Sequence, residues 1–98
     1  MAVRDEGSRS AESCDAATAA SARAGKAQEH ARQLAGRLAD TAGHIAATLD
    51  QVAETREARP GYADSTSLRE RARRTREKAD GERRDARSLR EAWGLPQV

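Results

Sequence analysis

A seven-residue repeat organises the centre of the chain. Leu38, Ile45 and Val52 are each followed by an alanine and, three positions on, by a threonine. Seven residues make about two turns of α-helix, so residues of each kind form a stripe along one side of a helix. The pattern therefore predicts coiled-coil-like helix packing over this segment.

The first helix is predicted between Ser10 and Arg59. Ser10 is a favoured N-cap residue that precedes acidic residues suited to the helix dipole. Pro60-Gly61 ends the pattern because proline restricts the residue before it. Residues 1–9 are polar and without periodicity, which predicts a flexible N-terminus.

The second helix is predicted over residues 67–93, after a turn at residues 60–66. Ser67 and Glu70 match a capping box, with Ser67 as the N-cap. Gly94 follows Trp93 at the position of a C-cap glycine, and Pro96 lies just beyond it. Residues 94–98 form a short tail. The expected fold is an all-α, antiparallel hairpin of two helices, about 10–59 and 67–93.

The expected contact between the helices places large residues against small ones. Folding the chain back about Tyr62 brings Val52 near Ala72, Ile45 near Ala79 and Leu38 near Ala86, so that the side chains interdigitate. This register, inferred from spacing, leaves residues 10–30 without a partner. The expected seam positions are Ala31, Ala35, Leu38, Ala42, Ile45, Leu49 and Val52 in the first helix, and Leu68, Ala72, Thr75, Ala79, Glu82, Ala86, Leu89 and Trp93 in the second.

The core of such a hairpin is thin, because the chain of 98 residues holds only ten Leu, Ile and Val residues and no Phe. The simplest completion is a second copy that makes a four-helix bundle as a homodimer. A helical protein partner and a loose monomer remain alternatives. The residues expected to carry association are Leu34, Leu38, Ile45, Leu49, Val52, Leu89 and Trp93.

Charge in the second helix suggests a different function. Ten Arg or Lys residues and six acids lie between Arg69 and Glu91, giving that stretch a net charge of +4. Arginine suits phosphate binding, so non-specific nucleic-acid binding is the alternative function. However, the acids are interleaved at i, i+4 spacing, as in a solvated helix. The candidate phosphate-binding residues are Arg73, Arg74, Arg76, Arg83, Arg84 and Arg87.

Catalytic and metal-binding patterns are missing from the sequence. His30 and His44 lie about 21 Å apart along a helix, so one chain cannot bind one metal with both. Cys14 is the only cysteine; it is either a small packing residue or a thiol that joins two copies. We expect no enzymatic activity and no cofactor. Without an apolar leader or a membrane-length apolar stretch, we expect a cytoplasmic protein.

The composition resembles that of short Ala/Arg-rich helical proteins of high-GC bacteria, with 16 Arg against two Lys. This resemblance implies a bacterial origin and no particular function. Length and two helices are also similar to the WXG100 family. The turn reads Pro60-Gly61-Tyr62 where that family has Trp-x-Gly, and the family's C-terminal Tyr-x-x-x-Asp/Glu motif is missing. Because helix packing is the clearest pattern in the chain, the expected function is that of a self-associating structural or adaptor protein acting through helix packing.

Overall fold

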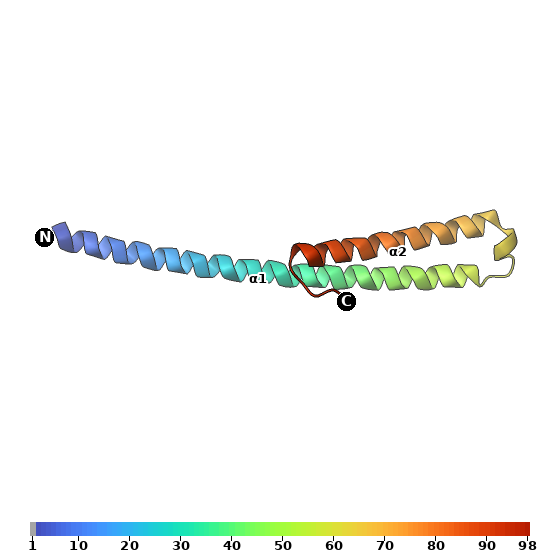
Figure 1. Ribbon diagram of the computed structural model, residues 1–98, viewed down its shortest axis with the longest axis horizontal. Helices are drawn as coiled ribbons and strands as arrows, with labels where there is room; N and C mark the ends of the chain where they lie inside the picture. The colour runs from blue at the N-terminus through green and yellow to red at the C-terminus, as the bar shows by residue number, and fades with distance from the viewer. Residues whose placement is uncertain (1) are drawn as a thin grey trace. The chain divides into compact units, whose positions relative to one another are not determined.

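Two long helices make up nearly all of the chain (Figure 1). The computed structural model describes the backbone of residues 2–98 and the side chains from Glu12 onward. Helix α1 spans Ala2–Glu57, a short 3₁₀ helix η1 spans Tyr62–Asp64, and α2 spans Thr66–Ala92. No strand occurs in this described part. The all-helical prediction is confirmed.

The chain divides into two compact units, Met1–Gln33 and Leu34–Val98. The described part of the first unit is helix alone, and its side chains from Glu12 to His30 are exposed. In the second unit, α2 runs back along α1 in the opposite direction (Figure 1). The antiparallel hairpin is therefore present within residues 34–98. Helix α1 begins at Ala2 and not near Ser10, so it includes most of the predicted N-terminal segment, residues 1–9.

The turn between the helices begins and ends close to the expected residues. Helix α1 ends two residues before Arg59, and Gly61 adopts φ 81°, a left-handed conformation that glycine accepts without steric cost. The N-cap of α2 is Ser65, whose hydroxyl accepts a hydrogen bond from the Leu68 amide at 3.2 Å. The prediction of Ser67 as the N-cap is thus wrong by two residues. Serine at 65 caps as well as serine at 67, and the preceding 3₁₀ turn presents Ser65 in extended backbone.

The end of α2 agrees with the prediction. Trp93 is the C-cap residue, and Gly94 follows it with φ 61°. The Leu95 amide donates to the Arg90 carbonyl at 2.8 Å, and the Gly94 amide donates to the Glu91 carbonyl at 3.2 Å. This pair of bonds is the Schellman motif, which satisfies the last carbonyls of a helix.

Alanine fills the contact between the helices. We call these residues the alanine seam; every one is at most 7% exposed. No large side chain is fully buried among the described residues. Small side chains allow two helix backbones to approach closely. The seam consists of Ala35, Ala39, Ala46 and Ala53 from α1 and Ala72, Thr75, Ala79 and Ala86 from α2.

The expected seam is therefore wrong at three positions of α1, while Ala35 and the buried residues of α2 lie where they were predicted. Ala39, Ala46 and Ala53 take the places that had been given to Leu38, Ile45 and Val52, one residue earlier in each heptad. One residue is about 100° around a helix. Large aliphatic residues consequently do not pack between the two helices as knobs into alanine holes. They lie beside the seam.

Candidate functional site: an exposed heptad stripe on α1

The residues excluded from the alanine seam form a second continuous stripe on α1. We call it the outer stripe: Leu34, Leu38, Thr41, Ile45, Thr48, Val52 and Thr55. Its members alternate at spacings of four and three, as in a coiled-coil seam. All seven are exposed, with Leu34 at 43%, Leu38 at 62%, Ile45 at 42% and Val52 at 38% of their full accessibility. Four aliphatic side chains thus share one exposed helix face.

The remaining predicted association residues lie elsewhere. Leu49 is half-buried at the border between the alanine seam and the outer stripe. Leu89 and Trp93 are half-buried near the end of α2, where the Trp93 amide donates to the Leu89 carbonyl at 3.2 Å. The structure therefore brings four of the seven predicted residues, Leu34, Leu38, Ile45 and Val52, onto the outer stripe.

Ion pairs close the side of the hairpin opposite the outer stripe. Arg76 bonds Glu57 at 2.7 Å and Asp50 at 3.5 Å, and Arg83 also bonds Asp50. Near the end of α2, Arg90 bonds Asp40 at 2.7 Å and is only 11% exposed at its side chain. These carboxylates lie on the α1 face that borders the alanine seam on its far side from Ile45.

The ion pairs depend on alanine, and not Leu, Ile or Val, forming the seam. Had the outer stripe faced α2, then Asp50 and Glu57 would lie on the opposite side of α1, out of reach of the arginines. The hydrogen bond from Arg76 lowers the pKa of Glu57, against the smaller effect of desolvation, and the pKa of Arg76 is raised in return, chiefly by that bond to Glu57. Both shifts favour the charged forms that the pair needs.

On the other flank, cations of α2 border the outer stripe. A shallow depression there is lined by Leu49, Val52, Arg56 and Thr75 together with three cations of α2, Arg71, Arg74 and Lys78. Arg56 crosses it to donate to the Thr75 hydroxyl at 2.8 Å. The Val52 end of the outer stripe is therefore the basic end.

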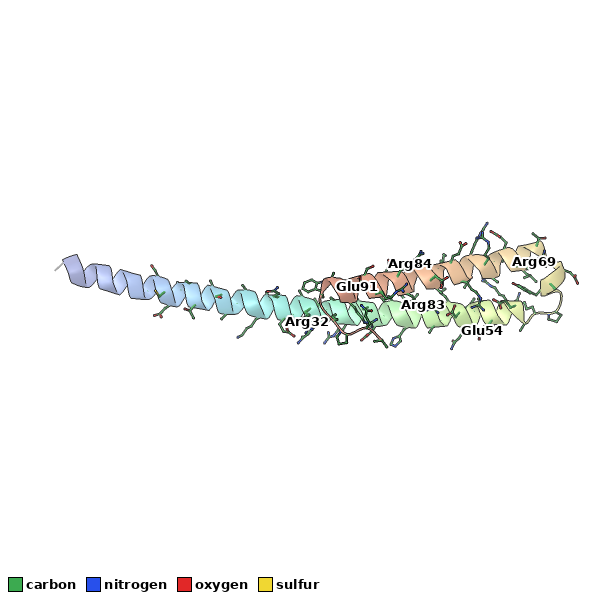
Figure 2. The ribbon with its side chains drawn as sticks, in the orientation of Figure 1. Arg32, Glu54, Arg69, Arg83, Arg84 and Glu91 are labelled. Carbon is green, nitrogen blue, oxygen red and sulfur yellow. The ribbon has the colours of Figure 1, made fainter. Side chains whose placement is uncertain are left out.

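Most of the predicted phosphate-binding arginines are engaged with the chain's own carboxylates. Arg73 bonds Glu70 at 2.5 Å and also bonds Glu77, while Arg74 bonds Glu70 at 3.2 Å. Arg73 is the main cause that lowers the pKa of Glu70 to about 2. Among the described residues, only Arg84 and Arg87 of the six make no ion pair. Figure 2 shows Arg83 on the side of α2 toward α1 and Arg84 on the side away from it.

Other candidate chemistry stays dispersed. His30, His44 and Cys14 are all exposed, and the Cys14 carbonyl accepts a bond from the Thr18 hydroxyl at 2.9 Å. Within the described residues, no three His, Cys, Asp or Glu side chains come together as a metal would require. None of the helices in that part is long and apolar enough to span a membrane.

Comparisons with known proteins give no family for this chain: no family model, no curated protein and no solved structure matches it.

Proposed function

We propose that this chain is a non-enzymatic helical adaptor that associates with a second copy of itself by packing the outer stripe of α1. The observation that supports the proposal is a mismatch between the core and the surface. The hairpin core is alanine, while Leu34, Leu38, Ile45 and Val52 lie on one exposed face.

Burial of that face between two copies would supply the apolar stabilisation that the alanine core of the hairpin lacks. A fully buried aliphatic side chain stabilises by roughly 1.5–3 kcal/mol, whereas alanine buries little apolar area. Heptad spacing also gives the outer stripe the geometry of a helix-packing surface and not of scattered exposed residues. A protein with this surface is expected to act by bringing helices together, in a cytoplasmic setting without cofactors.

The nucleic-acid alternative has weaker support. Four of its six arginines already bond carboxylates of the chain, and the interleaved acids offset their charge. Arg84 and Arg87 by themselves would neutralise few phosphates, so the expected affinity is low.

Light scattering coupled to size exclusion tests self-association directly. We expect a dimer mass for the wild type and a monomer mass at the same concentration for Ile45→Asp, because a charge at the centre of a buried stripe is costly. Each 1.4 kcal/mol of association free energy lost raises the dissociation constant of the dimer about tenfold. Ala47→Asp is the matched control, since Ala47 is exposed on the far side of α1 from Ile45 and should leave the mass unchanged.

A monomeric wild type, or an unchanged mass for Ile45→Asp, would reject self-association through the outer stripe. Binding of a DNA duplex followed by fluorescence anisotropy completes the test. Micromolar binding whose log affinity falls linearly with log salt, and which Arg84→Glu and Arg87→Glu abolish, would support the alternative instead.

A further inference from the structure

The outer stripe and the alanine seam lie on adjacent faces of α1. Each aliphatic residue of the repeat precedes a seam alanine by one position, as in Ile45-Ala46 and Val52-Ala53. One position corresponds to about 100° around the helix. In a four-helix bundle each helix contacts two neighbours through adjacent faces. Helix α1 therefore has the faces of a bundle helix, one of them occupied by its own α2.

Only one face of α2 lies beside the outer stripe. The depression lined by Val52 includes Arg71, Arg74 and Lys78, and the same helix face continues at spacings of three and four through Gly81, Asp85 and Ser88. Along this face the cations lie in the first half of α2 and the acid in the second. A copy of this face that runs in the opposite direction would bring its acid, Asp85, beside the cations of the first.

From these features we infer that two copies pair with their α1 helices antiparallel, about a two-fold axis between Thr41 and Ile45. This inference rests on the proposed self-association and adds its geometry. Antiparallel pairing places equivalent flanks of the two α1 helices side by side, so both α2 helices lie on the same side and complete a four-helix bundle. The first-half cations of each α2 then approach Asp85 of the other copy.

The size pattern and the charge of the outer stripe favour the same direction. With the axis between Thr41 and Ile45, antiparallel pairing overlaps the stripe from Leu34 to Val52. It sets Ile45 of one copy against Thr41 of the other, and Leu38 against Thr48. The basic ends are then about 30 Å apart, at 1.5 Å per residue, beyond the Debye length of roughly 8–10 Å. Parallel pairing would place both basic ends at the same level.

Disulfide trapping distinguishes the two directions. In a Cys14→Ser background, Leu34→Cys and Val52→Cys proteins are mixed, allowed to exchange subunits and oxidised, with a mass tag on one of them. Antiparallel pairing predicts a mixed disulfide between residue 34 of one copy and residue 52 of the other. Each protein oxidised alone should remain uncrosslinked, because equivalent positions lie more than about 20 Å apart.

The outcomes separate this inference from the proposed function. A disulfide between two copies of the same variant, when it is oxidised alone, would overturn the antiparallel arrangement while leaving self-association intact. A dimer mass with no disulfide in any mixture would also overturn it, because the copies would then meet through another face. A monomer mass for the wild-type protein would reject both proposals together.

Charge reversal on α2 provides a second, independent test. Lys78→Asp and Asp85→Lys should each weaken the dimer, by about two- to fivefold for a partly exposed pair, and the double variant should recover most of the loss. Arg84→Asp is the control, because Arg84 lies on the side of α2 away from α1 (Figure 2). Equal weakening by Arg84→Asp, or no recovery in the double variant, would contradict the proposed contact between the two α2 helices.

Discussion

At the scale of single residues, alanine is the feature on which the hairpin depends. Ala39, Ala46, Ala53 and Ala79 are each at most 1% exposed, so the seam has no room for a larger side chain. The seam predicted from the sequence contains Leu38, Ile45 and Val52, and not the alanine that follows each of them. Because both stripes repeat every seven residues, periodicity by itself could not distinguish the flanking stripe from the seam.

Enlarging a seam alanine should therefore destabilise the hairpin. We expect Ala46→Leu to cost about 1–3 kcal/mol of unfolding free energy, because it overpacks a contact between two backbones. Ala47→Leu is the matched control, being the same substitution at an exposed position. Thermal unfolding followed by circular dichroism measures both; equal melting temperatures would contradict the alanine seam.

Replacing a glycine inside α1 should have the opposite effect and stabilise the protein. A Cβ built on Gly43 meets no heavy atom within 4 Å, and its φ lies in the ordinary range for the helix. Gly43→Ala should stabilise the protein by about 1 kcal/mol, the difference in helix propensity between the two residues. The measurement is urea unfolding, and a lower midpoint would mean that the glycine has a packing role.

At the scale of elements, the ends of α2 show how far local sequence determines structure. Gly94 was predicted as the C-terminal glycine because only a residue tolerant of positive φ suits that position, and its φ of 61° confirms this. The start was misassigned because Ser65 and Ser67 are chemically equivalent caps. Choosing between them requires the path of the preceding turn.

Substitution of the two serines tests that assignment. Ser65→Ala should lower the unfolding free energy by about 1 kcal/mol, because the Leu68 amide loses its hydrogen bond to the Ser65 hydroxyl. Ser67→Ala, the matched control, should change it by only a few tenths. Should Ser67→Ala prove the more damaging in thermal unfolding, the helix would begin at the residue expected from the capping box.

At the scale of the whole molecule, ion pairs between α1 and α2 and within α2 make the stability of the protein depend on pH. The pKa of Glu57 is lowered by Arg76, and that of Glu70 is lowered to about 2, first by Arg73. A carboxyl whose pKa is lower in the folded chain stabilises it above the ordinary value of 4.5 and loses that effect as pH falls.

The melting temperature should accordingly fall as pH decreases from about 4.5 toward 2. Because the pKa of Glu70 carries the larger shift, Glu70→Gln should reduce this fall, and Glu57→Gln should reduce it to a smaller extent. Glu91→Gln serves as the control, since Glu91 makes no ion pair among the described residues. A melting temperature independent of pH in this range would mean that these pairs do not stabilise the fold.

From the sequence alone the two helices and one side of their contact can be predicted, apart from where each helix begins. Helix-forming residues, proline and glycine at the turn, and the C-terminal glycine are local signals, so the two helices, the turn and the seam of α2 could be predicted. On α2 the stripes on either side of the seam are charged, so only the seam stripe could face α1.

Which stripe of α1 faces α2, and hence which residues form the candidate site, depends on how the helices pack. Alanine and Leu/Ile/Val stripes have the same period and lie about 100° apart, so the sequence pattern supports either. The choice depends on contacts between residues far apart in the chain. With the alanine seam inside, Arg76, Arg83 and Arg90 reach Asp50, Glu57 and Asp40, and the aliphatic stripe is left exposed.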